Sequence, residues 1–465
     1  MNPLAVHPTG IPGLMIVDLP LHDDPRGWFK ENWQREKMTA LGLPDFGPVQ
    51  HNIAFNTDAG VIRGVHAEPW DKFVSLVSGR IFGAWVDLRE GPHFGRVVTR
   101  EMGPDTAVFV PRGVGNAYQT LEPATTYTYL VNAHWSPQAR DSYSFVNLAD
   151  PALAIPWPLP VNPASMSAAD QDHPELAAVE PVKPRSTVIL GAGGQLGRAL
   201  TALLPCALAF TRADLDLTEP DHLDRINWAD VEVVINAAAY TAVDAAETPA
   251  GRRQAWSTNV TALARLVEMC RTHRICLVHV SSDYVFDGSA PEHDETEPLS
   301  PLGVYGQTKA AGDALVSTLA RHYLIRTSWV VGAGRNFVAT MADLADRDVS
   351  PEVVNDQFGR LTFTEDLAAA VAHLLRTGAA PGTYNVTNTG PVQSWADIAA
   401  TVFELRGKDP SLVRPVSGHS YATAQLNAGR PFAPRPTNSA LNLAKIGATG
   451  LEPPPAQDRL REYLS

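Results

Sequence analysis

A glycine-rich stretch in the middle of the chain, "VILGAGGQLGRAL" at residues 188–200, constrains the fold more than any other feature. An apolar strand runs into closely spaced glycines and then into a helical pattern. This order is typical of the first strand, loop and helix of a dinucleotide-binding domain. Because such a domain begins at this strand, the long segment before it is expected to form a separate unit.

The sequences before and after this stretch differ in their residue patterns. Upstream, short β-branched and aromatic runs such as "TTYTYLV" are broken by Gly and Pro, which predicts an all-β sandwich or barrel. Downstream, "VEVVINAAA" is followed by "NVTALARLVEMCRTH", an alternation that predicts a doubly wound parallel α/β sheet. A Pro- and Ala-rich stretch lies between. We predict an all-β domain at residues 1–172, a linker at 173–186 and an α/β domain at 187–465.

Charge and cysteine content exclude several classes of protein. The net charge of −13 and the pI near 5.5 argue against a nucleic-acid partner. Cys206, Cys270 and Cys276 have no CxxC spacing, so neither a disulfide framework nor a zinc site is expected. No apolar run is long enough for a membrane span and no signal-like segment begins the chain, so we expect a cytoplasmic protein.

The glycine loop predicts a nucleotide cofactor. Gly191, Gly194 and Gly197 would allow backbone N–H groups to approach a pyrophosphate at the start of a helix. Arg212 is the charged residue nearest the end of the second strand, and an arginine there suits a 2′-phosphate. NADPH is therefore favoured, with NADH possible because Asp214 and Asp216 follow closely. Arg212 could equally be a solvated loop residue.

Tyr305 and Lys309 are four residues apart, which places them on one face of a helix. A free tyrosine has a pKa of about 10, and a neighbouring ammonium lowers it toward the range useful for proton transfer. Ser282 ends a strand upstream and could hold a carbonyl oxygen. A YxxxK pair alone is usually chance, but glycine loop, Ser and Tyr-Lys in this order indicate a reductase.

The second half resembles the dTDP-4-dehydrorhamnose reductases, a family of extended short-chain dehydrogenases/reductases. The motifs "INAAAYTAVDAAE", "SSDYVFDG", "YGQTKAAGD", "VVNDQFGRLT" and "RPTNSALN" carry this resemblance. It implies a Rossmann-type sheet with a small C-terminal substrate lobe, and Ser282, Tyr305 and Lys309 as the catalytic triad. The implied cofactor site comprises Gly191, Gly194, Gln195, Leu196, Asp216, Leu217, Ala237, Ala238 and Ala239, with Tyr305 and Lys309; Arg212 joins it on the reasoning given above. The implied sugar-nucleotide contacts are Trp329, Asn355, Gln357 and Arg435.

His66 is the most informative residue of the first half. It lies in "VIRGVHAEPWDKFVSLVSG", between Arg63 and Lys72, in strand-like sequence. A lone histidine is more often structural than catalytic, but "DDPRGWFKE" upstream and Tyr129 downstream accompany it. Neither HxH nor HExxH spacing occurs, so no metal site is expected.

This half resembles the dTDP-4-dehydrorhamnose 3,5-epimerases, which are cupin-type jelly-roll barrels, on the motifs "DPRGWFKE", "IRGVH", "VDLREGPHFGR", "VPRGVGNAYQTL" and "ADPALAIPWPL". The resemblance implies a His66–Asp170 base, Tyr129 as the acid and Lys72 as an enolate stabiliser. The implied substrate contacts are Arg26, Glu31, Gln50, Asn52 and Arg63. Two positions depart from the family: "QHN" places His51 where Asp is usual, and Asn116 replaces a His.

Together the resemblances imply one chain, expected as a homodimer, that epimerises a dTDP-4-dehydro-6-deoxy sugar at C3 and C5 and reduces its C4 ketone. Two alternatives stay open. The chain could be a reductase with a non-catalytic cupin domain used for dimerisation, or a non-catalytic regulatory subunit on a reductase fold.

Overall fold

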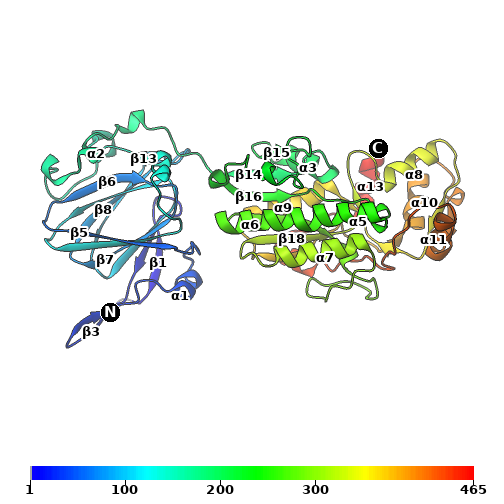
Figure 1. The fold of residues 1–465 in the computed structure, drawn as a ribbon, viewed down its shortest axis with the longest axis horizontal. Helices are drawn as coiled ribbons and strands as arrows, with labels where there is room; N and C mark the ends of the chain where they lie inside the picture. Colours follow the sequence, from blue (N-terminus) through cyan, green and yellow to red (C-terminus); the bar gives the residue numbers. More distant parts are fainter. Residues whose placement is uncertain (1–2) are drawn as a thin grey trace. The chain divides into compact units, whose positions relative to one another are not determined.

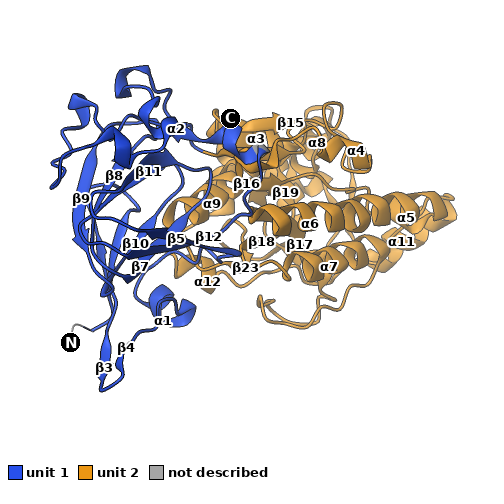
Figure 2. Ribbon diagram, turned by 60° about the vertical axis from the view of Figure 1, so that its left-hand side comes forward, with its two compact units in different colours: residues 1–184 blue, residues 185–465 orange. Residues whose placement is uncertain are grey.

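The computed structural model describes residues 3–465 and divides the chain into two compact units, residues 1–184 and 185–465 (Figures 1 and 2). Unit 1 is built of β-strands and unit 2 of alternating strands and helices, which confirms the two predicted fold classes. No helix among the described residues is both long and apolar enough to cross a membrane.

Unit 1 consists of two antiparallel sheets. The first has the order β1-β2-β10-β7-β12-β5 and the second β13-β6-β11-β8-β9. The bounds are β1 (Ala5–Pro8), β2 (Met15–Asp18), β5 (Gln50–Asn56), β6 (Ile62–Ala67), β7 (Lys72–Ser78), β8 (Ile81–Asp87), β9 (Val97–Met102), β10 (Thr106–Val110), β11 (Val114–Thr120), β12 (Thr125–Val131) and β13 (Ser144–Phe145). This is the predicted cupin-like architecture.

Core clusters lie on both sides of the first sheet around β10, which explains why β10 is buried along its whole length. Side chains such as Val74, Trp85 and Tyr118 form one core cluster shared by the two sheets. A second cluster joins Phe73 and Phe109 to Met38 of helix α1 (Arg35–Ala40). A third packs β6, β8 and β11 against the segment that follows β13.

That segment includes much of the predicted linker. The N–H of Val182 donates to the Leu88 carbonyl at 2.7 Å, and the Val182 carbonyl accepts from Glu90 at 3.0 Å. Leu176 packs on the third cluster, and its N–H donates to Asp150 at 2.6 Å. Residues 174–182 therefore lie against unit 1 because their apolar side chains cover a sheet face.

Unit 2 contains a six-stranded parallel sheet of order β15-β14-β16-β17-β18-β23. The bounds are β14 (Ser186–Leu190), β15 (Leu208–Phe210), β16 (Val231–Asn236), β17 (Cys276–Ser282), β18 (His322–Thr327) and β23 (Gly382–Asn385). Val188 and Leu190 point to one face, covered by α6 (Leu263–His273) and α7 (Val304–Val316). Ile189 points to the other, covered by α3 (Gln195–Leu203) and α9 (Thr364–Thr377). The sheet is doubly wound, as predicted.

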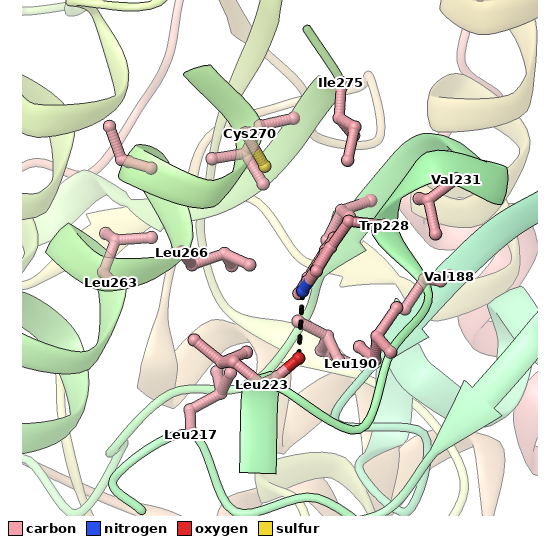
Figure 3. Close-up of a cluster of buried hydrophobic side chains, with 14 of the residues drawn as sticks. Val188, Leu190, Leu217, Leu223, Trp228, Val231, Leu263, Leu266, Cys270 and Ile275 are labelled. Atoms are coloured by element: carbon pink, nitrogen blue, oxygen red, sulfur yellow. Dashed lines mark hydrogen bonds between the residues drawn. The ribbon is translucent and has the colours of Figure 1, made fainter. Parts of the chain in front are cut away.

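The core on the first of these faces includes a buried tryptophan (Figure 3). Trp228 packs among Leu223, Leu266 and Cys270, and its indole N–H donates to the Leu223 carbonyl at 2.9 Å. The hydrogen bond satisfies the only polar atom of this side chain, so the indole can lie in an apolar core without cost to solvation.

A smaller lobe follows the sheet. Its core joins α8 (Phe337–Asp346), α10 (Trp395–Leu405) and α13 (Ala456–Leu464) through residues such as Val338, Phe403 and Leu460. The short strands β20 (Glu352–Val354) and β25 (Arg414–Val416) pair beside them. This is the predicted small C-terminal lobe.

Candidate active sites

Unit 1 holds a cavity of about 190 Å³ that opens between strands of its two sheets. Strands β5, β6, β7, β11 and β12 supply most of its lining, so the pleat alternation decides which side chains face it. The lining residues are Ala54, Arg63, Gly64, His66, Glu68, Lys72, Asn116, Tyr118, Tyr127 and Tyr129. Three of the four catalytic residues predicted for this unit, His66, Lys72 and Tyr129, are among them.

The fourth, Asp170, is not part of the cavity lining but hydrogen-bonds to His66. Helix α2 (Ala168–Gln171), capped by Ser167, places the Asp170 Oδ1 2.8 Å from His66 Nε2. Burial raises the pKa of Asp170, but the hydrogen bond and charge of His66, together with the Gly64 N–H and His173, outweigh it and lower that pKa below its ordinary value. The carboxylate is therefore ionised beside the imidazole, the arrangement that orients a general base.

Tyr129 lies on β12 and lines the same cavity as the β6 residues. Burial raises its pKa to about 12, and the Glu68 charge acts in the same direction. The phenol stays protonated at neutral pH, so it can donate a proton to a carbanion.

Lys72 is paired with a residue that the sequence reasoning did not single out. Its Nζ lies 2.7 Å from Glu68 Oε1, and both side chains are at least nine-tenths buried. The ammonium also lies 5.9 Å from the Tyr129 ring centroid. The pair with Glu68 offsets the cost of burying the Lys72 side chain, since an unpaired charge would be costly there. Its position, directly after the strand that carries His66, was the available signal.

Sequence reasoning also missed the lining residues Tyr118 and Tyr127, and noted Asn116 only as a departure from the family. Asn116 donates from Nδ2 to the Tyr127 hydroxyl at 3.1 Å, and Tyr118 stacks on Tyr127 at 4.3 Å between ring centroids. His51, the other departure, is near Thr128 Oγ1 at 2.5 Å and does not line the cavity.

The predicted substrate residues of unit 1 are only partly brought together. Arg63 lines the cavity and donates to Asn56 at 3.1 Å. Gln50 and Asn52 bond to each other at 2.9 Å on β5, outside the lining. Arg26 is exposed on the hairpin of β3 (His22–Asp24) and β4 (Gly27–Phe29), paired with Asp24, and Glu31 pairs with Lys37. Arg26 and Glu31 therefore do not meet the cavity within the described chain.

In unit 2, Ser282, Tyr305 and Lys309 converge at the carboxyl end of β17 and the first turns of α7. Burial raises the pKa of Tyr305, and a hydrogen bond to Ser282 opposes this rise. Lys309 is 2% exposed; its Nζ donates to the Val280 carbonyl at 2.6 Å, and burial lowers its pKa to about 8. Ser282 donates to Asp283 at 2.9 Å, and burial raises the pKa of Asp283 to about 6.

The loop before α3 fits a dinucleotide. Gly191 has φ +81°, and a Cβ there would lie 2.7 Å from the Ala238 nitrogen. A Cβ on Gly197 would lie 2.1 Å from the Gly191 carbonyl oxygen. Gly194 caps α3 with no side-chain acceptor, which leaves backbone donors at the helix start. Gln195 Oε1 is buried without a hydrogen-bond partner among the described residues, as expected where a ligand completes the site.

The remaining cofactor predictions fall around this loop. Arg212 is largely exposed and pairs with Asp216 at 2.9 Å, so Asp216 holds the arginine that would face a 2′-phosphate. Ala237 donates its N–H to Leu190, and Ala238 and Ala239 follow at the end of β16. Leu217 is buried in the hydrophobic core and Leu196 packs beneath the loop, so only their backbones are available to a cofactor.

The predicted sugar-nucleotide residues of the lobe are more dispersed. Trp329 stacks on Trp395 with 3.7 Å between ring centroids and lies against Gly359. Asn355 is exposed, and Gln357 is half-buried near Gly418. Arg435 pairs with Asp244 at 2.8 Å, close to Tyr284 and to a narrow pocket that Tyr305 also lines. Arg435 bonds to Tyr284, whose ring lies 5.7 Å from that of Tyr305 between centroids.

Comparison with known proteins gives the same division of the chain. Residues 8–178 match the family model described as dTDP-4-dehydrorhamnose 3,5-epimerase, and residues 185–465 match the one described as RmlD substrate binding domain. The first part is 47% identical over 180 residues to a protein RmlC homolog of Streptococcus pyogenes serotype M6, covering 38% of this chain and 90% of that protein.

The second part is 37% identical over 282 residues to a dTDP-4-dehydrorhamnose reductase of Mycolicibacterium smegmatis, covering 58% of this chain and 82% of that protein. It also resembles the crystal structure of a dTDP-4-dehydrorhamnose reductase from Bacillus anthracis in complex with NADP. The TM-score is 0.55 at 30% identity, covering 60% of this chain and 98% of that one.

Proposed function

The chain belongs to the dTDP-4-dehydrorhamnose 3,5-epimerase family through unit 1 and to the RmlD family through unit 2, and from this premise we propose a bifunctional enzyme. It epimerises dTDP-4-dehydro-6-deoxyglucose at C3 and C5 and then reduces the C4 ketone with NADPH, giving dTDP-rhamnose. The observation that carries the proposal is the presence of two complete acid–base sets in one chain, His66–Asp170 with Tyr129 and Ser282 with Tyr305 and Lys309.

For the epimerase, we assign the base to His66. Protons at C3 and C5 are acidic because each carbon adjoins the C4 ketone and its carbanion is an enolate. His66 removes such a proton, and the ionised Asp170 stabilises the imidazolium that forms. Tyr129 returns a proton from the other side, and the Lys72 ammonium offsets the enolate charge.

For the reductase, Tyr305 is the proton donor. When bound at the glycine loop, NADPH supplies the hydride for the ketone carbon. Tyr305 gives its proton to the carbonyl oxygen as negative charge develops there, and Ser282 holds that oxygen by a hydrogen bond. Lys309 stabilises the phenolate that Tyr305 becomes. The backbone donors at the α3 start and the Arg212 side chain would hold the cofactor's phosphates.

Deuterium exchange and NADPH oxidation test the two activities separately. The purified chain is supplied with dTDP-4-dehydro-6-deoxyglucose in D₂O, with and without NADPH. We expect deuterium at C3 and C5 without NADPH and loss of NADPH absorbance when it is present. A chain that oxidises NADPH only after a separate epimerase is added is a reductase alone. One that does not oxidise it even then is not a reductase, and one that incorporates no deuterium is not an epimerase.

We also propose that the enzyme is a homodimer. Strand β5 lies at the edge of its sheet, and Ile53 and Phe55 on it are 63% and 61% exposed. An apolar edge strand is an unfavourable surface in a monomer and is usually covered. Light scattering of the full chain tests the dimer, and Phe55→Glu should dissociate it.

A further inference from the structure

His173 lies beside the catalytic pair of unit 1, and the mechanism proposed above does not use it. It follows Asp170 by three residues, just beyond helix α2, and its side chain is 8% exposed. Its Nε2 lies 3.8 Å from Asp170 Oδ1, the oxygen that His66 Nε2 contacts at 2.8 Å. One buried carboxylate oxygen therefore faces a nitrogen of each of two imidazoles.

Packing fixes the orientation of both imidazole rings. The His173 ring stacks on Phe145 with 4.7 Å between centroids. The His66 ring meets these two rings edge-on, at 5.4 Å from His173 and 5.6 Å from Phe145 between centroids. Phe145 belongs to β13 and pairs with His66 of β6 in the sheet register. Because the fold already holds the two histidines side by side, little side-chain entropy is lost when a ligand binds both of them.

These three side chains provide a set of metal ligands. One nitrogen of each histidine and one Asp170 oxygen lie within 4.8 Å of one another. A tetrahedral zinc ion about 2.0 Å from each ligand needs ligand atoms about 3.3 Å apart, so shifts of about 1 Å bring the three into place. Two imidazole nitrogens and one carboxylate oxygen match the protein ligands of open, three-ligand zinc sites. We propose that His66, Asp170 and His173 bind zinc, with its fourth position toward the cavity that His66 lines, and that zinc bound there inhibits the epimerase.

Zinc at this site leaves His66 without a free lone pair. Without metal, the ionised Asp170 can only accept, so His66 carries its proton on Nε2, and Nδ1 is the bare nitrogen that takes a proton from the sugar. Zinc binds the Nε2 lone pair, and the single proton of the neutral ring then lies on Nδ1. A protonated Nδ1 cannot accept another proton. This regulation rests on the proposed epimerase function, whereas zinc binding is measurable without turnover.

Neighbouring groups make this site weaker than a structural zinc site. The cluster has three protein ligands, whereas structural sites have four. Glu68 offsets the charge of Lys72 at 2.7 Å, but Arg63 lines the same cavity and repels a cation. Metal-bound His173 carries its proton on Nδ1, which is buried and has no hydrogen-bond partner among the described residues. We therefore expect reversible binding, so that a chelator restores the epimerase.

Deuterium exchange in the presence of zinc tests the inhibition. The full-length chain is given dTDP-4-dehydro-6-deoxyglucose in D₂O without NADPH, and zinc should slow the exchange until EDTA is added. Magnesium at the same concentration should have no effect, because it prefers six oxygen ligands. Exchange that zinc does not slow refutes the inhibition. An equal loss of NADPH oxidation on substrate already epimerised shows a general effect of zinc and contradicts the proposal as well.

His173→Phe separates this site from other zinc-binding groups. Phenylalanine keeps a ring against Phe145 but offers no nitrogen. Loss of a ligand costs at least as much metal affinity as loss of its outer-shell partner, so the same inhibition should need about 10–100-fold more zinc or higher. His134→Phe, at an exposed histidine outside the cluster, is the matched control and should keep the wild-type response. Equal zinc sensitivity in wild type and His173→Phe overturns the proposal.

Histidine ¹⁵N spectra of the substrate-free, full-length chain test the site without turnover. We expect His66, identified by the signals lost in His66→Gln, to carry its proton on Nε2 without metal and on Nδ1 with zinc. Zinc that leaves His66 Nε2 protonated refutes the proposal, and this holds even where His173→Phe does not fold. A chain that shows the change of tautomer but incorporates no deuterium in the absence of zinc supports the metal site and refutes the epimerase function instead.

Discussion

Replacing Asp170 by Asn tests the epimerase assignment in a chain that contains its own control. Asn keeps the size and one hydrogen-bond acceptor for His66, but it removes the negative charge 2.8 Å from the imidazole. Opposite charges about 4 Å apart attract by about 4 kcal/mol at an effective dielectric constant of about 20. The His66 side chain is 32% exposed, and solvent screening reduces this to about 2 kcal/mol. Because about 1.4 kcal/mol is a factor of ten in rate, exchange should slow by about 30-fold or more.

The assay is the rate of deuterium incorporation at C3 and C5 in D₂O, followed by NMR. The same preparation should oxidise NADPH at an unchanged rate when given substrate already epimerised by a separate enzyme. Asp172→Asn is the matched control, because Asp172 is exposed two residues further on and should leave exchange unchanged. Exchange within threefold of the wild-type rate in the Asp170 variant would refute the reasoning, and so would an equal loss of both activities.

Three further predictions concern unit 2: its activity, its affinity for NADPH and the pH dependence of its stability. Tyr305→Phe should lower NADPH oxidation by about 10²–10⁴-fold and leave exchange unchanged, with unaltered NADPH affinity as the check that the site is intact. Gly191→Ala places a Cβ 2.7 Å from the Ala238 nitrogen at φ +81°, so fluorescence titration should show NADPH binding at least about tenfold weaker. Asp283→Asn removes a carboxyl whose pKa burial raises to about 6. Because the folded state binds that proton more tightly than the unfolded state, the wild type loses stability as pH rises from about 4 to 6. The variant should gain about 2–3 kcal/mol of unfolding free energy above pH 6 and little at pH 4, as measured by urea denaturation; an equal gain at both would contradict the burial argument.

Features that depend on near neighbours in the chain were readable from the sequence. Val188, Ile189 and Leu190 had to face alternate sides of a strand, and helices now cover both sides. Tyr305 and Lys309 share a helix face by spacing alone. Gly191 and Gly197 allow the close backbone approach that the loop requires.

Pairings between distant segments were not readable in the same way. His66 and Asp170 are separated by 104 positions, and only the resemblance to a family suggested their contact. No periodicity links Glu68 to Lys72, since neither lies in a helix, yet the cavity buries them as a pair. The exposure of Arg26 likewise depends on how its hairpin leaves the sheet.

The chemistry of the two sites sets the order in which they act. Removal of a proton at C3 or C5 depends on the C4 ketone, because only the ketone spreads the resulting charge onto oxygen. Reduction turns that ketone into an alcohol, after which the protons at C3 and C5 are no longer acidic. The epimerase must therefore act first, and its reversible product is withdrawn by the reductase. A single chain supplies both sites in equal number, so the product of the reversible step always meets as many reducing sites as there are sites that form it.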